Sequence, residues 1–461
     1  MIRRLVTALD DRLGIAPFLR KALRKAFPDH WSFMLGEIAL YAFVFLVLTG
    51  VFLGYFFDAS GQHVAYHGQY RSLQGTSLSA AFASVLRISF DTRAGLFIRQ
   101  MHHWAALLFV AAIIVHMCRI FFTGAFRRPR ELNWIVGFSL LVLALAAGFT
   151  GYSLPDDLLS GTGLRIAYSV AISIPLVGTY VAYLFFGGAF PAPDTTNRLF
   201  ITHILVLPTL IAGAMALHLI IIWRQKHTQF AGPGRTESNV MGSALWPNYA
   251  MKSVGLGLAV FAVIAALGGV FQINPVWLYG PFDPWNVSSP AQPDWYVGWL
   301  EGALRLGPSW EFHIFGHDVP PSFFPGVALP SVLLAILLCW PFIERWVTHD
   351  GRVHQLLDHP SDAPVRTAIG AAILAFSGVL TLAGSDDVQA KLMAIPVESL
   401  ASAYKILLMA LPVVVGILTY QLALEVRRRR SVYTLPPGRI VISRAQSGGF
   451  IDEPEGGEAA Q

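Results

Sequence analysis

The sequence predicts an all-α polytopic membrane protein with eight transmembrane helices. Hydrophobic residues make up 54% of the 461 residues, charged residues make up only 13%, and the mean hydropathy is +0.55. Soluble domains carry about 25% charged residues, so this composition excludes an ordinary soluble protein. Eight apolar runs reach the roughly 20 residues that a helix needs to cross the hydrocarbon core of a bilayer.

These apolar runs define the predicted helices in chain order. They lie near residues 34–57, 97–122, 134–154, 198–223, 253–273, 327–347, 366–384 and 401–426. Residues 1–33 precede them and mix Arg and Lys with Leu, Ile and Phe at roughly helical spacing, which predicts an amphipathic helix in the membrane interface. This arm has no uninterrupted apolar core, which argues against a cleavable signal peptide.

Basic residues set the predicted orientation of the helices. Of the 33 Lys and Arg, 24 fall in the N-terminal arm, in the loops after spans two, four and six, and in the C-terminal tail. By the positive-inside rule, both termini are expected on the cytoplasmic side of a cell membrane. The same bias accounts for the net charge of +5, so no nucleic-acid partner is needed to explain it.

Two long connections on the outer side are expected to carry function. Residues 155–197 and 274–326 contain many aromatic residues, which argues against disorder in loops of this length. The tail, residues 431–461, ends in an acidic, Gly-rich segment and is predicted to be flexible and cytoplasmic. Cys118 and Cys339 form no CxxCH or CxxC pair, so covalently attached heme, an iron–sulfur cluster, a zinc ribbon and a structural disulfide are unsupported.

Histidines interrupt the second predicted span, which reads RQMHHWAALLFVAAIIVHMCR from residue 99 to residue 119. His102 and His116 are 14 residues apart, which on an α-helix corresponds to about 21 Å and nearly a whole number of turns. Their side chains are therefore expected on nearly one face of the helix at two depths. His103 falls on a different face and is left out of this pair.

The fourth predicted span repeats the pattern with His203 and His218, 15 residues apart and again broadly on one face. Spans two and four run in the same direction, so His102 is expected opposite His203 near the outer side. His116 is correspondingly expected opposite His218 near the inner side. Two stacked bis-histidine sites follow, and facing imidazoles leave room for a macrocycle with two axial ligands, which points to heme.

Glycines on the first and third spans share this period. Gly36 and Gly50 are 14 residues apart, as are Gly137 and Gly151. Glycine lets a flat porphyrin approach the backbone closely, although paired glycines in membrane helices also serve plain helix packing. The shared period favours a four-helix bundle that encloses two hemes, with ligands on spans two and four.

Alternatives stay open for the histidines and for the arginines beside them. Intramembrane His residues also join helices through hydrogen bonds, but four of them in matched registers favour heme ligation. Arg99 and Arg119 stand at opposite ends of the histidine helix, where each is expected either to pair with a heme propionate or to extend toward lipid headgroups. A proton or metal transporter with midplane histidines would leave the glycine pairs unexplained.

Short motifs accompany these pairs. They are GYSLP at 151–155, SIPLVG at 173–178, PDWY at 293–296, FFTGAFRRPRELNW at 121–134, LPDDLLSGTGLRIAY at 154–168 and WRQKHTQFAGPGRTE at 223–237. Together with the histidines and glycines, they make residues 30–430 resemble the cytochrome b subunit of quinol to cytochrome c oxidoreductase (cytochrome bc) complexes. The last three motifs look most like the actinobacterial branch, so the resemblance implies menaquinol as the substrate.

The resemblance implies a diheme subunit of a respiratory enzyme. It implies that His102 and His203 bind a low-potential heme b near the outer side. It implies that His116 and His218 bind a high-potential heme b near the inner side. Quinol oxidation near the outer side would send one electron to a Rieske subunit and the other to an inner quinone-reducing site, which contributes to the proton gradient. The other implied partners are a cytochrome c subunit, expected to be diheme, an aa3-type terminal oxidase and a second copy of the chain in a homodimer.

The second outer loop supplies candidates for quinol oxidation. Asp294 and Glu301 are seven residues apart in PDWYVGWLEG and share a face if that segment is helical, so they are predicted to take protons from quinol. Tyr296 and Tyr152 are expected to add hydrogen bonds. The alternative is that Asp294 only caps a helix and that Glu301 is solvated. Most of the family carries Glu at position 294, which implies a larger share of proton transfer for Glu301.

Further departures from the family pattern affect the two ends of the bundle. Asp156 and Asp157 follow GYSLP, where mitochondrial relatives carry an uncharged Trp-Gly pair. At the inner side, Lys252 is followed by Ser253, where relatives often carry Asp. Lys252 and the nearby His227 are therefore the candidate residues of the inner quinone site.

The chain is expected to divide into four parts. They are an interfacial arm (1–33), a four-helix bundle with two b hemes (34–250), a C-terminal four-helix region with the outer quinol loop (251–430) and a tail (431–461). A diheme membrane anchor for a dehydrogenase is the main alternative, but such anchors are shorter and lack a PDWY-type loop. The chain has no motif for a Rieske cluster or a cytochrome c, so electrons are expected to leave through partner subunits.

Overall fold

The computed structural model describes residues 10–12, 14–286, 292–314, 316–432, 440–444 and 450–454. Its helices are α2 (Ile15–Leu23), η1 (Trp31–Met34), α3 (Leu35–Phe56), η2 (Arg71–Leu73), α4 (Ala80–Phe90), α5 (Gly95–Phe122), α6 (Glu131–Tyr152), α7 (Leu158–Ile172), α8 (Gly178–Phe186), α9 (Thr195–Ile201), η3 (Thr202–Val206), α10 (Leu207–Gln225), η4 (Leu245–Tyr249), α11 (Ala250–Val270), α12 (Val276–Tyr279), α13 (Trp295–Leu306), η5 (Phe324–Ala328), α14 (Leu329–Thr348), η6 (Pro360–Asp362), α15 (Pro364–Ala383), α16 (Asp386–Met393) and α17 (Val397–Val432). The strands are short: β1 (Ala26–Phe27), β2 (His63–Ala65), β3 (Ser77–Ser79), β4 (Gln229–Phe230), β5 (Ser243–Ala244), β6 (Phe312–Ile314), β7 (His317–Val319), β8 (Leu356–Leu357), β9 (Ile440–Arg444) and β10 (Phe450–Pro454).

The predicted fold class is confirmed. Eight helical segments within the described residues are long and apolar enough to cross a membrane, and each overlaps one predicted span. They are Trp31–Phe56, Gly95–Phe122, Glu131–Tyr152, Thr195–Gln225, Leu245–Val270, Phe324–Thr348, Pro364–Ala383 and Val397–Arg430. Many large apolar side chains on them are exposed, among them Leu258 on α11 and Met409 on α17, because lipid is the solvent that covers these faces.

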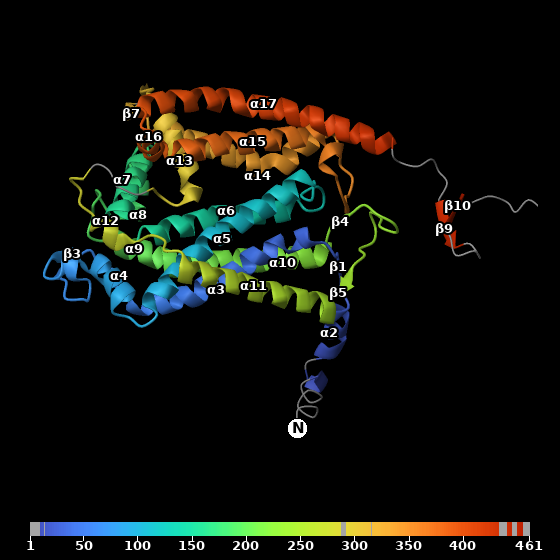
Figure 1. The fold of residues 1–461 in the computed structure, drawn as a ribbon, viewed down its shortest axis with the longest axis horizontal. Coiled ribbons are helices and arrows are strands. Elements are labelled where there is room, and N and C mark those ends of the chain that lie inside the picture. Colours follow the sequence, from blue (N-terminus) through green and yellow to red (C-terminus); the bar gives the residue numbers. More distant parts are fainter. Residues whose placement is uncertain are drawn as a thin grey trace, which may run out of the picture.

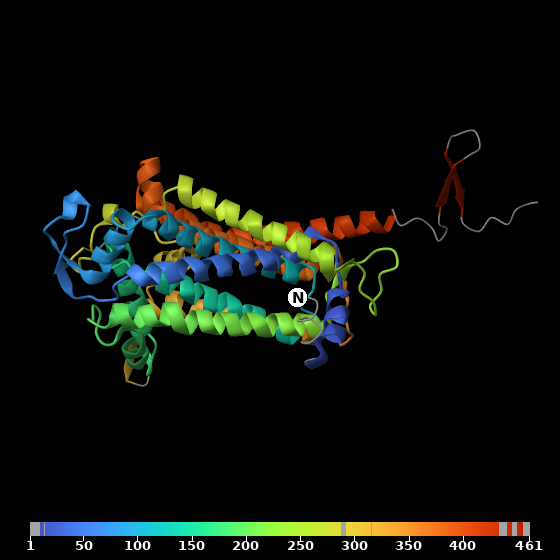
Figure 2. The ribbon, with the colours of Figure 1, turned by 90° about the horizontal axis from the view of Figure 1, so that it is seen from below.

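Four of these helices form the bundle that the histidine pattern requires. Helix α3 packs on α5, and α6 packs on the helix that continues from α9 through η3 to α10 (Figures 1 and 2). Helix α11 lies against α3 and α5, while α14, α15 and α17 form a layer on the other side of α5 and α6 (Figure 1). The bundle core contains Ala42, Val110, Ala144 and Ile211, which are almost completely buried.

The two ends of the bundle differ. Helices α4, α7, α8, α12, α13 and α16 and the hairpin β2–β3 gather at one end, on the left of Figure 1. Helix α2 and the strand pairs β1–β5 and β4–β8 gather at the other. Following the predicted orientation, these are named the outer end and the inner end.

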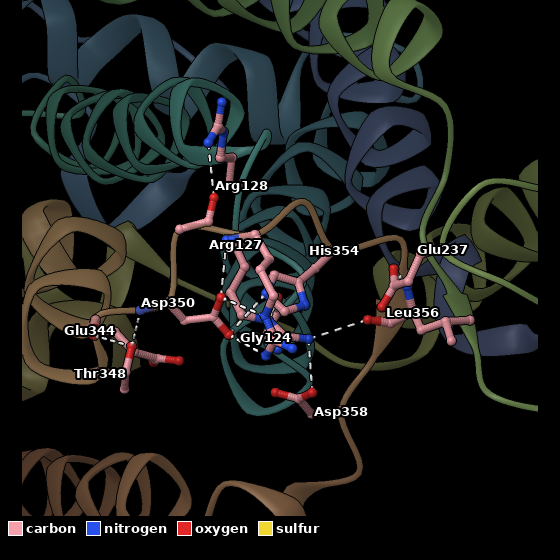
Figure 3. A network of polar contacts seen from close by, with 12 residues as sticks. Gly124, Arg127, Arg128, Glu237, Glu344, Thr348, Asp350, His354, Leu356 and Asp358 are labelled. Carbon is pink, nitrogen blue, oxygen red and sulfur yellow. Dashed lines mark hydrogen bonds and ion pairs between the residues drawn. The ribbon is translucent and has the colours of Figure 1, made fainter.

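Arginines tie the inner loops together. Arg127, after α5, forms an ion pair of 2.8 Å with Asp358 in the connection between α14 and α15 (Figure 3). Arg366 on α15 is buried and bridges Asp358 and Glu344, each at 2.7 Å. Glu237, between α10 and α11, accepts a hydrogen bond of 2.9 Å from the backbone N–H of Leu356 (Figure 3). Three connections far apart in sequence are thereby held against one another, which fixes the inner ends of the spans that they join.

The two terminal segments differ in how far they follow the prediction. Helix α2 lies within the predicted amphipathic arm, and Arg20 and Lys21 are in its last turn. Residues 1–9 and 13 of that arm lie outside the described residues. In the tail, β9 and β10 pair antiparallel, a hairpin that the composition of this predicted flexible segment does not indicate.

Candidate functional site

The four intramembrane histidines meet in the two expected pairs. The ring centres of His102 and His203 are 6.3 Å apart, with an angle of 75° between the ring planes. The ring centres of His116 and His218 are 6.5 Å apart, with an angle of 74°. The two pairs are stacked along the bundle because each helix contributes one histidine to each pair.

A local irregularity explains how the unequal spacings on the two helices still match. On a regular α-helix, the 15 residues between His203 and His218 would turn about 100° further than the 14 residues between His102 and His116. The π-helical segment η3, Thr202–Val206, begins one residue before His203. A π turn holds one residue more than an α turn, so it absorbs the extra residue and brings both histidines onto the face toward α5.

Threonine hydroxyls orient the two outer histidines. Thr49 Oγ1 lies 2.9 Å from Nδ1 of His102, and Thr150 Oγ1 lies 3.2 Å from Nδ1 of His203. Both pairs are 53 residues apart in sequence, so the two halves of the bundle repeat one arrangement. A hydrogen bond at Nδ1 leaves Nε2 as the nitrogen available for a metal.

The separation of the two rings in each pair can be compared with the separations expected for ligation of one metal and for a direct hydrogen bond. An imidazole nitrogen bonds a first-row metal at about 2 Å. Each nitrogen lies roughly 1.2 Å from its ring centre, given ring bonds of about 1.35 Å. Two axial imidazoles on one iron therefore place their ring centres about 6.4 Å apart, whereas an N–H···N hydrogen bond of about 3 Å gives about 5.4 Å. The separations of 6.3 Å and 6.5 Å match the first case.

Each predicted glycine lies against one of these histidines. A Cβ atom added to Gly36 would lie 3.2 Å from Cε1 of His116, and one on Gly50 would lie 3.2 Å from Cε1 of His102. The corresponding distances are 3.6 Å from Gly137 to His218 and 2.5 Å from Gly151 to His203. The glycines thus keep the backbone clear beside all four rings, as a porphyrin bound between them requires.

The two flanking arginines leave buried donors free. Nη2 of Arg99 donates to the carbonyl of Asn274 at 2.8 Å, but its buried Nε has no partner among the described residues. Nε and Nη2 of Arg119 are likewise buried without a described partner, and its guanidinium lies 4.2 Å above the ring of Phe33. Buried cationic donors without acceptors suit an anionic ligand such as a carboxylate, which is what a heme propionate offers.

At the outer end, the side chain of Asp294 contacts His103, which the helical spacing places outside the two histidine pairs. Its Oδ1 lies 2.7 Å from Nε2 of His103, and its Oδ2 accepts a hydrogen bond of 3.1 Å from the hydroxyl of Tyr296. Asp294 occupies the N-cap position of α13, yet its side chain makes no capping hydrogen bond. Burial and the neighbouring carboxylate raise the pKa of Tyr296 well above its usual value, so this tyrosine stays a proton-bearing donor.

Glu301, two turns further along α13, is not solvated. Its side chain is 18% exposed, and one oxygen, Oε1, accepts a hydrogen bond of 2.7 Å from Nη2 of Arg305. The other oxygen, Oε2, is buried without a described partner. Burial raises the pKa of Glu301 despite Arg305, which also pairs with Asp386 and, at 3.3 Å, with Asp387. A carboxyl group with a raised pKa and a free oxygen is suited to exchange protons.

Tyr152 and the aspartates after it complete the outer end. The Tyr152 hydroxyl donates to the carbonyl of Leu159 at 3.0 Å and lies within electrostatic range of Asp157, Asp294 and Glu301. Asp157 is buried at the N-cap of α7, where Oδ2 accepts from the Leu159 N–H at 3.1 Å, and burial raises its pKa to about 6. The predicted outer residues therefore gather at one end, and Asp157 has a structural role there.

The inner end has a cavity of about 280 Å³. It is lined by Pro28, Asp29, His30, Phe33, Phe230 and Arg235. The predicted Lys252 reaches its edge through an ion pair with Asp29. The predicted His227 does not line the cavity, because its ring packs on Phe27 with ring centres 4.6 Å apart. Burial lowers the pKa of His227 to about 4, so this imidazole is neutral.

Comparisons with known proteins decide the family. A model described as cytochrome b (N-terminal)/b6/petB matches residues 107–281. The cytochrome b subunit of the cytochrome bc1 complex from Streptomyces coelicolor is 48% identical over 445 residues, which cover 96% of this chain and 82% of that protein. The chain belongs to the cytochrome b subunits of cytochrome bc1 complexes. The same subunit from Mycobacterium tuberculosis is 47% identical over 446 residues, with 96% and 81% covered.

A solved structure supports the fold of this cytochrome b chain. A hyperthermophilic respiratory complex III superimposes with a TM-score of 0.66 over 90% of this chain and 100% of the other, at 19% identity. Membership confirms the predicted family and its actinobacterial type, the oxidoreductase activity of the complex and the integral membrane location. Heme b and a place in a multi-subunit complex follow from the family.

Sequence reasoning missed two kinds of residue in this cytochrome b. His103 was excluded because it lies off the heme face, although that off-face position directs it toward Asp294, 191 residues away. Thr49 and Thr150 each precede a predicted glycine, and this repeated Thr-Gly pair was the available signal for them.

Proposed function

We propose that this cytochrome b binds two b hemes through His102 with His203 and His116 with His218, and carries electrons between an outer quinol-oxidising site and an inner quinone-reducing site. The ring separations of 6.3 Å and 6.5 Å are the observation that supports this most strongly. When bound, the two hemes supply one-electron redox centres at two depths of the membrane.

At the outer site, we assign proton acceptance from quinol to Asp294. The 2.7 Å contact with His103 and the hydrogen bond from Tyr296 hold its carboxylate in one orientation. Glu301 lies on the same helix with a free oxygen and a raised pKa, which suits it to accept the second proton. Arg305, bound to both Glu301 and Asp386, holds Glu301 in place and leads toward the outer surface.

At the inner site, the cavity bordered by Asp29, His30 and Arg235 is the proposed place of quinone reduction. Arg119 lies over Phe33, one of the lining residues, so the cavity adjoins the inner end of the histidine helix α5. Lys252 holds Asp29 at the edge, which gives this predicted residue a positioning role. The position of His227 behind Phe27 gives it a packing role instead.

The partners and substrate follow the family. One electron of each quinol passes to a Rieske subunit and onward to a cytochrome c subunit, which in this branch is diheme. Menaquinol is the proposed substrate, both termini face the cytoplasm, and the complex is a homodimer that associates with an aa3-type oxidase. Relatives from Streptomyces and Mycobacterium support this choice of branch.

The experiment is a reduced-minus-oxidised spectrum and a pyridine hemochrome measurement on the purified complex. The wild-type chain is expected to hold two b hemes, and His116→Ala is expected to retain one, because removal of an axial ligand releases the inner heme. His227→Ala is the matched control, since this inner histidine packs on Phe27 and lies outside both pairs. Equal heme content in all three proteins, or none in the wild type, would contradict the proposal.

A further inference from the structure

A carboxylate lies inside the first membrane span at the inner end. Glu37 on α3 directly follows Gly36, whose backbone faces His116. Ionisable groups within membrane spans are costly and are retained mainly where they serve transport of protons, ions or substrates. Glu37 belongs neither to the two histidine pairs nor to the outer site.

Among the described residues, the side-chain hydrogen bonds to the Glu37 carboxylate come only from hydroxyl groups. The Tyr249 hydroxyl donates to Oε1, and the Ser253 hydroxyl donates to Oε2 at 2.5 Å. Tyr41 in turn lies 2.9 Å from Ser253 through its hydroxyl. Lys252, the cation next to Ser253, pairs with Asp29 instead. Glu37 is thus a carboxyl group in a membrane span that hydroxyl donors position and that has no ion pair with a cation among the described residues.

Glu37 adjoins the inner cavity through two separate elements. Phe33, which lines the cavity, precedes Glu37 by four residues on the continuous helical segment from η1 to α3, so the two residues lie about one turn apart. Asp29, which also lines the cavity, binds Lys252 beside Ser253. Ser253, which donates to Glu37, therefore directly follows the residue at the cavity edge, where Asp29 and Lys252 are each about half exposed.

We propose that Glu37 is a catalytic residue of the inner quinone site and gives a proton to the quinone oxygen as quinone is reduced; this rests on the proposed function. Reduction adds two electrons, which originate from quinol oxidised at the outer site, and two protons, one of which comes from water at the inner end. Glu37 supplies one proton: its O–H bond breaks as a new O–H bond forms on the quinone. The carboxylate then regains a proton from water at the inner end, near Asp29 and Lys252. Tyr249 and Ser253 position the carboxyl group.

The test isolates the inner site by blocking the outer one. In the full complex carrying Asp294→Asn and Glu301→Gln, added menaquinol can reduce the b hemes only by the reverse reaction at the inner site. Glu37→Gln in this parent keeps the shape and one acceptor oxygen but cannot take up the proton. It is expected to slow heme reduction by roughly 100-fold, within the range of general acid–base effects. Glu37→Asp is expected to restore most of the rate.

Matched controls separate proton transfer from helix contact. Glu131→Gln removes a carboxyl group at the inner end of α6, whose nearest cation is Arg345 at 3.9 Å, and is expected to leave the rate unchanged. Ser253→Ala removes one hydroxyl donor and keeps the carboxyl group, so a loss of about threefold is expected, near 0.6 kcal/mol. A loss as large as that of Glu37→Gln would assign the effect to helix packing and overturn the proposal. A rate for Glu37→Gln within about twofold of the parent would also overturn it.

Failure of the underlying function is recognised separately. If the parent contains no b heme, or contains both hemes but shows no reduction by menaquinol, the proposed inner site fails before Glu37 is compared. Both hemes with rapid reduction in the parent and in Glu37→Gln would leave the inner site intact and refute only the role of Glu37.

Discussion

Replacing His103 by leucine tests how the outer carboxylate is held. The contact between Nε2 of His103 and Oδ1 of Asp294 is 2.7 Å, and both side chains are less than 15% exposed. A hydrogen bond to a charged group contributes about 1.5–3 kcal/mol. Because each 1.4 kcal/mol corresponds to about a tenfold change in rate, His103→Leu is expected to lower kcat/KM for quinol roughly 10- to 100-fold. The assay is cytochrome c reduction by menaquinol in the purified complex.

His103→Gln is the matched variant, because its amide keeps a donor near the carboxylate. It is expected to stay within about threefold of the wild type. The heme spectrum must show two b hemes in both variants, since His102 is the neighbouring residue. The reasoning is refuted if leucine and glutamine have the same effect, or if His103→Leu oxidises quinol as fast as the wild type.

Three further predictions concern the heme contact, the inner loops and acid stability. Gly151→Ala places a Cβ atom 2.5 Å from the neighbouring histidine ring and is expected to lose the outer heme, whereas Gly54→Ala, with no atom within 4 Å, is expected to keep both in a hemochrome measurement. Arg366→Met removes the arginine partner of Glu344 and one of the two arginine partners of Asp358, and is expected to destabilise the chain by about 1.5–3 kcal/mol in a thermal melt, while Arg352→Met at the exposed surface is expected to leave Tm unchanged. The folded chain raises the pKa of Asp157 from 3.8 to about 6, so it binds this proton more tightly than the unfolded chain does, and the free energy of unfolding falls as pH rises across that interval. Asp157→Asn is expected to flatten this slope of Tm between pH 4 and 6, and an unchanged slope would contradict the assignment.

Much of the membrane architecture was readable because the bilayer imposes a simple rule. Apolar runs of about 20 residues located all eight spans. The helices extend past several of these runs: the span predicted at 401–426 is helical over Val397–Arg430, since a helix continues into polar residues that hydropathy does not count. The histidine pairs were readable for a related reason, because helical periodicity converts sequence spacing into depth and face.

Contacts between segments far apart in the chain could not be predicted from the sequence. The sequence left open whether Asp294 caps a helix, and only the fold shows that its side chain turns to His103 instead. The carboxylate of Glu37 and the hydroxyl of Tyr249 are 212 residues apart, so no local pattern joins them. The inner cavity likewise combines the chain before α3 with the loop after α10, which explains why His227 was a plausible candidate from its position and still lies outside the lining.

The central claim is that each of two histidine pairs holds one heme iron from both sides. Low-temperature electron paramagnetic resonance of the oxidised complex, with the Rieske signal accounted for, tests it most directly. Two low-spin ferric signals typical of bis-imidazole ligation are predicted in the wild type, and only one is predicted in His218→Ala. A high-spin ferric b heme in the wild type, or two unaltered low-spin signals in the variant, would contradict the account.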